Sequence, residues 1–289
     1  MKKLLPDALK ELWETVDEKH FTGEQFYYEQ ERRLDGYRQV WKQALLLDGH
    51  QDLKNSLLGE LGKYLGITDL ATIERRCAKS TATAKHEWEG KVQPHDRRAV
   101  EQYYGESDGT RDELMWWHTL ERDTGPLAYV TALEFARQRG CRNYLDFGAG
   151  VGSGGILFAR HGFQVALADI SSSLLRFDRW RFELRKLPAE YFDLKSASLP
   201  DAAFDFVTAM DVFEHLFDPV GAAGDLWRSL KPGGFLFGRF NTEGDEDSPQ
   251  HIVKDFGPTF QSMRELGFVQ VWQDEWLWGH QVFQKSRGG

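Results

Sequence analysis

The sequence has few of the residues that mark several large classes of protein. Only two cysteines, Cys77 and Cys141, occur among 289 residues, and their spacing matches no metal-binding or redox motif. We interpret both as reduced thiols, which favours a cytoplasmic location. No apolar run is long enough to span a bilayer, and the apolar stretch near the N-terminus is too short for a signal peptide.

Positive charge is also scarce. The chain has 36 Lys and Arg against 45 Asp and Glu, a net charge of −9. This balance argues against nucleic-acid binding and against attachment to an anionic membrane surface. The apolar content of 41% is ample for a packed core.

The hydrophobic pattern changes its period along the chain. Up to about residue 125 the spacing is that of helices. Thr22-x-x-Gln25 is a capping box at the start of a long helix, and a single helix is expected from Thr68 to about Glu89. From Asn143 onward, seven strand-like runs alternate with helical segments, and the last of these runs is Trp276–Gln284. The alternation predicts an α/β fold with a mostly parallel, doubly wound sheet. We predict a helical N-terminal domain over residues 1–125 and a ligand-binding domain over 126–289. The first would cover the substrate, set specificity or form a homodimer.

The most informative stretch runs from Asn143 to Gly155. A short apolar run is followed by five glycines within eight residues and then by a helix-like pattern. A strand, a glycine-rich turn and a helix are typical of nucleotide-binding α/β proteins.

Two ligands fit this stretch. Gly150-x-Gly152-x-x-Gly155 matches the dinucleotide fingerprint, in which a helix N-terminus holds a pyrophosphate. However, Asp146 lies just before the glycines, where its carboxylate would repel a pyrophosphate and attract an ammonium group. S-adenosylmethionine has an amino-acid end and no phosphate. Asp146 favours that cofactor, but the glycine loop alone leaves both ligands open.

Four elements in order make the choice more specific. They are the loop Leu145–Gly152, the acid Asp169 about twenty residues after it, the run Phe204–Leu216 with its Glu-His pair, and Lys231-Pro-Gly-Gly234. From residue 127 to the C-terminus, the sequence resembles the class I S-adenosylmethionine-dependent methyltransferases of small-molecule type. The resemblance implies their Rossmann-like sheet and S-adenosyl-L-methionine as the cofactor.

The resemblance also implies roles at the matching positions. Asp169 would accept hydrogen bonds from the ribose hydroxyls, and Asp146 would act on the ammonium group, directly or through water. The expected cofactor-binding residues are Asp146, Gly148, Ala149, Gly150, Gly152, Asp169, Ile170, Asp193, Leu194, Met210 and Asp211.

His215 is the candidate general base. An oxygen or nitrogen nucleophile often has to lose a proton before methyl transfer, and His215 follows the fourth strand on the cofactor side. Its alternative role is to cap or pack the next helix. Asp211, Glu214, His215 and His251 are residue types that bind divalent ions. Because spacing alone is permissive, we predict no metal.

Aromatic residues upstream of the loop are candidates for the acceptor side. The expected acceptor contacts are Tyr104, Trp117, His118, Phe213 and His251. The alternative for the aromatic residues is ordinary helix packing. The leading prediction is methyl transfer to an oxygen or nitrogen, or to a carbon, of a small molecule. The alternatives are a catalytically silent cofactor-binding accessory protein and a nicotinamide-dependent dehydrogenase.

Overall fold

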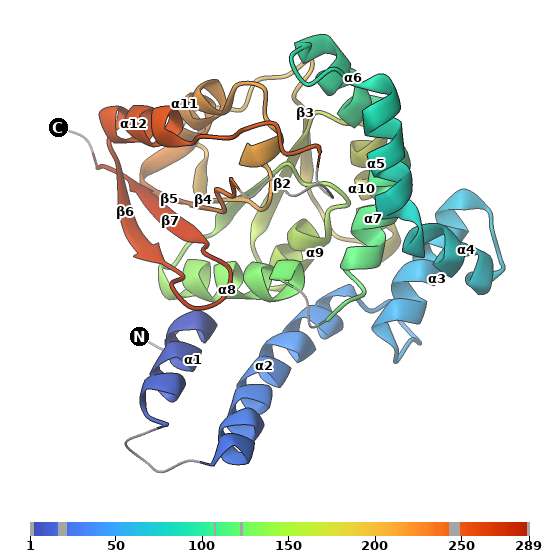
Figure 1. The fold of residues 1–289 in the computed structure, drawn as a ribbon, viewed down its shortest axis with the longest axis horizontal. Helices are drawn as coiled ribbons and strands as arrows, with labels where there is room; N and C mark the ends of the chain where they lie inside the picture. Colours follow the sequence, from blue (N-terminus) through green and yellow to red (C-terminus); the bar gives the residue numbers. More distant parts are fainter. Residues whose placement is uncertain (1–2, 17–21, 107, 122–123, 243–248, 288–289) are drawn as a thin grey trace.

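The computed structural model describes residues 3–16, 22–106, 108–121, 124–242 and 249–287. Its centre is a seven-stranded sheet with helices on both faces (Figure 1). The strands are β1 (Asn143–Phe147), β2 (Gln164–Asp169), β3 (Glu190–Asp193), β4 (Phe204–Ala209), β5 (Leu230–Gly238), β6 (Phe268–Gln273) and β7 (Gln281–Lys285).

The strand order is β3-β2-β1-β4-β5-β7-β6. The first five strands of this order are parallel, whereas β7 runs antiparallel to both β5 and β6. The order reverses between β1 and β4, and ligands of such sheets bind beyond the carboxyl ends of the strands at this point. The predicted α/β class with a mostly parallel, Rossmann-like sheet is confirmed.

Both faces of the sheet are buried because alternate side chains enter two separate apolar clusters. Tyr144 and Leu167 pack with α8 (Thr124–Gln138), α9 (Ser153–Arg160) and α10 (Ser172–Arg185). Leu145 and Ala168 pack on the other face, with α11 (Pro219–Ser229) and α12 (Gly257–Leu266). Strands buried on both faces read as nearly continuous apolar runs, as β1 and β2 do.

In the described residues before α8 there are seven helices. They are α1 (Leu5–Glu14), α2 (Gly23–Leu45), α3 (Leu53–Leu65), α4 (Leu70–Ala78), α5 (Ser80–Lys91), α6 (Arg97–Glu106) and α7 (Asp108–Trp117). Thr22 and Gln25 form the predicted capping box at the start of α2. In the described part of the chain, every helix is either too short or too polar to cross a lipid bilayer.

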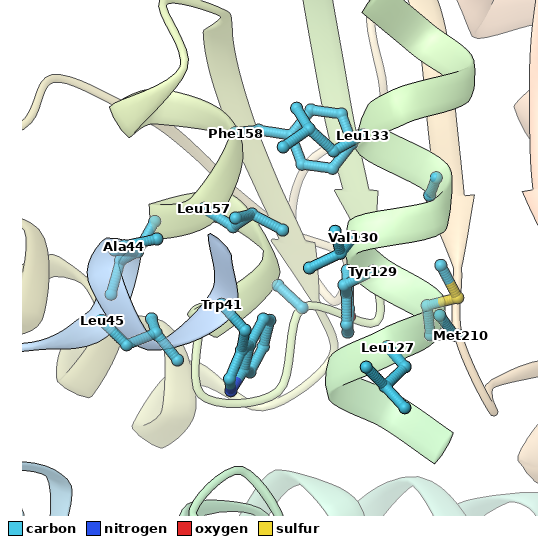
Figure 2. Close-up of a cluster of buried hydrophobic side chains, with 14 of the residues drawn as sticks. Trp41, Ala44, Leu45, Leu127, Tyr129, Val130, Leu133, Leu157, Phe158 and Met210 are labelled. Atoms are coloured by element: carbon cyan, nitrogen blue, oxygen red, sulfur yellow. The ribbon is translucent and has the colours of Figure 1, made fainter. Parts of the chain in front are cut away.

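The N-terminal helices share a core with the sheet. Trp41 of α2 is fully buried, with its ring stacked on Tyr129 of α8 at 5.9 Å between centroids. Figure 2 shows Trp41, Ala44 and Leu45 facing side chains of α8 and α9. In Figure 1, α1 and α2 lie beside α8, and α3 to α7 continue along one side of the sheet. The division at residue 125 remains a prediction, because one apolar cluster runs from Leu4 to Val282.

Two local predictions were imprecise. A single helix was expected from Thr68 to about Glu89, but Lys79 separates α4 from α5. A last strand was expected over Trp276–Gln284, but β7 begins only at Gln281. The backbone N–H groups of Trp276, Leu277 and Trp278 bond to the Asp274 carboxylate instead of forming a ladder.

Candidate active site

The candidate site lies at the carboxyl ends of four parallel strands. Asp146 is in β1, Asp169 ends β2, Asp193 ends β3, and Asp211 follows β4. Asp169 and Asp193 are register partners across β2 and β3. The four acids are therefore far apart in the sequence but lie at the same edge of the sheet, around the glycine loop.

The glycine loop needs backbone angles that other residues adopt only with strain. Gly148, Gly150 and Gly152 have φ values of +71°, +61° and +66°. The N–H groups of Gly148 and Ala149 donate to the carbonyl of Ala168, which holds the loop against the end of β2. The spacing of glycines at every second residue thus has a direct conformational cause.

Asp146 is completely enclosed. Its Oδ1 accepts hydrogen bonds from the Thr208 hydroxyl at 2.9 Å and the Tyr129 hydroxyl at 3.2 Å. Burial raises the pKa of Asp146 to about 7. Its Oδ2 is buried and has no hydrogen-bond partner among the described residues. A buried carboxylate oxygen without a partner is costly, and a cationic ligand group at this loop would relieve that cost.

Asp169, a predicted cofactor-binding residue, is held in place by the glycine loop and by the start of α10. Its Oδ2 accepts from the Gly150 N–H at 2.9 Å and its Oδ1 from the Ser171 N–H at 2.8 Å. Burial raises the pKa of Asp169 to about 6, against the opposing effect of these N–H groups. Each oxygen keeps a second lone pair, so the carboxylate can still accept from a vicinal diol.

The next predicted cofactor residues surround Asp169. Asp193 accepts from the Ser172 hydroxyl at 2.6 Å and from the Lys195 N–H at 3.1 Å. Leu194 donates its N–H to the carbonyl of Asp169, while Ile170 is half-buried after β2. These residues are brought together as expected.

The end of β4 differs in detail from the expectation. Met210 is buried in the apolar cluster beside Leu127 and Tyr129 (Figure 2). Asp211 has φ +50°, unusual for a non-glycine residue, and pairs with Arg239 at 3.2 Å. The side chain of Val212 lies over Gly148.

His215 ends a short 3₁₀ helix, η1 (Phe213–His215). Its Nδ1 lies 3.1 Å from the carbonyl oxygen of Gln250 and 2.9 Å from the Tyr104 hydroxyl. Because a carbonyl oxygen only accepts, we assign the proton to Nδ1, which leaves the lone pair on Nε2. Burial and the neighbouring His251 lower the pKa of His215 to about 4, so the ring is neutral at physiological pH.

His251 and Glu214 complete the surroundings of His215. The rings of His215 and His251 are 4.9 Å apart between centroids. Glu214 is 1% exposed, and its Oε2 has no hydrogen-bond partner in the described part of the chain. Burial, with a contribution from Asp211, raises the pKa of Glu214 to about 8. Asp211 was the remaining residue in the set of possible metal ligands named from the sequence. Its carboxylate pairs with Arg239 instead.

The helix α7 lies against the cofactor loop, and α6 lies against His215. Leu114 of α7 covers Gly150, and Tyr104 of α6 reaches His215. His118 is buried, with its Nδ1 2.9 Å from the Ser153 hydroxyl at the start of α9. Trp117 is 40% exposed.

The expected acceptor contacts therefore separate into two groups. Tyr104 and His251 both lie beside the candidate base His215. Phe213 is fully buried, 4.5 Å from Phe240 between ring centroids, and His118 supports the loop through Ser153. The structure gives Phe213 and His118 a packing role.

Sequence reasoning missed a buried ionic cluster behind the loop. Glu60 of α3 accepts bonds from Arg181 and Arg185 of α10, and all three side chains are at most 1% exposed. Arg181 also donates to the Val151 carbonyl and, at 2.9 Å, to the Ser153 hydroxyl. The available signal was a pair of arginines four residues apart on the apolar face of α10.

Comparisons with known proteins agree with this geometry. Residues 145–238 match the family model described as a methyltransferase domain. The demethylmenaquinone methyltransferase of Thermus thermophilus is 31% identical over 109 residues, 36% of this chain and 50% of that protein. The ubiquinone biosynthesis O-methyltransferase of Paracidovorax citrulli is 31% identical over 134 residues, 42% and 55% of the two chains.

The chain thus spans about half the length of the curated relatives that it matches. Among solved structures, an S-adenosylmethionine-dependent methyltransferase from Aquifex aeolicus has a TM-score of 0.45 at 17% identity, covering 56% of this chain and 92% of that one. The family match, the strand order and the acids around the glycine loop agree in placing a methyltransferase domain over residues 145–238.

Proposed function

We propose that this protein transfers a methyl group from S-adenosylmethionine to an oxygen or nitrogen, or to a carbon, of a small molecule. The observation that carries the proposal is the glycine loop flanked by Asp146 and Asp169, with an unsatisfied buried carboxylate oxygen on Asp146. A dinucleotide would place a pyrophosphate beside Asp146, whose carboxylate would repel it. Two relatives are named as a demethylmenaquinone methyltransferase and a ubiquinone biosynthesis O-methyltransferase, which supports a small-molecule acceptor.

The residues around the loop have separable tasks. Asp169 holds the ribose hydroxyls, while Asp146 provides negative charge for the ammonium group. The cofactor itself supplies the electrophilic methyl group on a sulfonium. The chain has to align the acceptor with that methyl and exclude water. Leu114 and Tyr104, which lie over the loop and beside His215, are placed to exclude water.

His215 is placed to take a proton from the acceptor. Its Nε2 carries the lone pair, because Nδ1 faces the carbonyl of Gln250. The Tyr104 hydroxyl and that carbonyl together set the orientation of the ring. A neutral imidazole with its lone pair on Nε2 can accept a proton.

Calorimetry with S-adenosylmethionine and its demethylated product tests the proposal. We expect both to bind, and we expect Asp169→Ala to weaken binding at least tenfold because two ribose hydroxyls lose their acceptor. Asp225→Ala is the control, since Asp225 is an exposed acid paired with Arg228 on α11. Absence of binding to the unmodified protein would reject the proposal.

The same samples separate the alternatives. A dehydrogenase would show a thermal shift with NAD(P)H, and we expect none. An accessory protein would bind the cofactor but methylate no member of a phenol, catechol and amine panel.

We also propose a cytoplasmic location and a homodimer through the N-terminal helices. The location is supported by Cys77 and Cys141, which are both unpaired and buried. The dimer is supported by the exposure of Tyr27 and Tyr28 on α2, at 60% and 68%. Light scattering at several protein concentrations tests the dimer.

A further inference from the structure

Three side chains of types that can bind a metal ion lie together beside the predicted acceptor position. One donor atom from each of Glu214, His215 and His251 lies within 4.8 Å of the other two. Glu214 and His215 belong to η1, whereas His251 belongs to the segment after β5. His215 and His251 are 36 residues apart in the sequence. The N–H groups of Ile252 and Val253 donate to the carbonyl of Glu214, which fastens this segment to η1.

Two features of this cluster point to a cation. The first is the Glu214 Oε2 atom, which is buried without a hydrogen-bond partner among the described residues. An unpaired buried carboxylate is strongly disfavoured, and a divalent ion would satisfy it.

The second feature is the orientation of His215. Its Nδ1 faces the Gln250 carbonyl at 3.1 Å, so Nε2 presents its lone pair on the other side of the ring. Ligating histidines characteristically donate their second ring nitrogen to a carbonyl or carboxylate, which fixes the tautomer.

From this arrangement we propose that Glu214, His215 and His251 bind one divalent transition-type ion, represented by Zn²⁺. Two imidazoles and one carboxylate suit zinc and similar ions, whereas Mg²⁺ and Ca²⁺ favour oxygen ligands. Ligand atoms on a tetrahedral zinc lie about 3.5 Å apart, given bonds of roughly 2.0–2.2 Å. The three donor atoms therefore have to move about 1 Å closer to one another when the ion binds.

Three protein ligands leave a position open, as in catalytic zinc sites. This inference deepens the proposed function and rests on it: the open position would take an oxygen of the acceptor. The ion would lower the pKa of that hydroxyl, whose proton then leaves to water. His215 would in that case act as a ligand instead of a direct base.

Calorimetry on the full chain, stripped with EDTA and titrated with ZnCl₂, tests the site. We expect one ion per chain, and binding at least tenfold weaker in Glu214→Gln and in His251→Ala. His50→Ala is the matched control, because His50 is exposed and lies between α2 and α3. Co²⁺ provides a second readout: its visible absorption should appear in the unmodified protein and be lost in His251→Ala.

The outcomes separate this inference from the proposed function. S-adenosylmethionine binding is measured on each sample, which also shows that each variant is folded. Cofactor binding without Zn²⁺ binding overturns the metal site and leaves the methyltransferase proposal intact. Zn²⁺ binding that neither variant weakens also overturns it. If Glu214→Gln does not fold, His251→Ala decides, because His251 is only partly buried.

Discussion

At the scale of single residues, the site depends on groups held in unfavourable states. Asp146 and Glu214 are buried carboxyls with unsatisfied oxygens, and the glycines take left-handed angles. Perturbed groups of this kind cluster at functional sites.

Gly150 permits a first test of this view. A Cβ at this position would lie 2.7 Å from Leu114, at a φ of +61°. We expect Gly150→Ala to weaken S-adenosylmethionine binding at least tenfold by calorimetry. Gly49→Ala is the control, since Gly49 has φ +86° but no atom within 4 Å of a Cβ. It should cost about 1 kcal/mol of stability, with unchanged cofactor affinity. Equal affinity in the two variants would contradict the prediction.

His118 gives the stability of the fold a pH dependence. Burial lowers its pKa from 6.5 to about 3. In the unfolded chain it takes up a proton below pH 6.5, but in the folded chain it stays neutral until about pH 3. Its contribution is therefore complete above pH 6.5 and is lost as the pH falls toward 3. Between pH 7.5 and 5 the loss is about 2 kcal/mol.

Urea denaturation at pH 7.5 and 5 measures this effect. The difference in unfolding free energy between the two pH values should be about 2 kcal/mol smaller in His118→Gln than in the unmodified protein. His50→Gln, at an exposed position, should leave the difference unchanged. An unaltered difference in His118→Gln would show that His118 is protonated in the folded state.

At the scale of elements, α10 connects the N-terminal helices to the cofactor loop. Arg181 bonds to Glu60 of α3 on one side and to Val151 and Ser153 on the other. Arg185 adds a bond to the Leu45 carbonyl at the end of α2. One buried carboxylate therefore holds three helices and the loop in a fixed relation.

Glu60→Gln should reveal this connection. Removing the charge leaves two buried guanidinium groups without compensation, which costs about 3–5 kcal/mol. We expect a loss of that size in urea denaturation and a weaker affinity for S-adenosylmethionine. Glu74→Gln breaks only an exposed pair with Lys54 and should cost less than about 1 kcal/mol. Similar losses of stability in both variants would mean that the buried ionic cluster stabilises the fold no more than an exposed ion pair.

At the scale of the whole molecule, the N-terminal helices and the sheet share one apolar cluster. Trp41 is buried between α8 and His118, and its indole N–H donates to the His118 carbonyl at 3.1 Å. Packing of this kind favours cooperative unfolding.

We therefore expect one unfolding transition for the whole chain. Tryptophan fluorescence and far-UV circular dichroism should give the same midpoint in urea. S-adenosylmethionine at one hundred times its Kd should raise the unfolding free energy measured by each of the two methods by about 2.7 kcal/mol. Two separate transitions, with only one shifted by the cofactor, would show that the helices before residue 125 fold independently.

The sequence by itself determined the α/β class, the seven strands and the residues of the cofactor loop. These follow from local rules: apolar periodicity, the need for glycine at positive φ, and acids placed at strand ends. Its misses were also local in origin. The break at Lys79 and the late start of β7 depend on hydrogen bonds that apolar spacing does not specify.

Only the tertiary structure decided which distant side chains meet. Glu60 and Arg181 are 121 residues apart, and Tyr104 and His215 are 111 apart. Likewise, Glu214 and His215 join His251, whereas Asp211 pairs with Arg239. Such contacts arise from packing of the whole chain, which no local pattern encodes. The cofactor loop could therefore be predicted from its residues, whereas Tyr104 and His251 could be named from the sequence only within a wider set of candidate neighbours of His215.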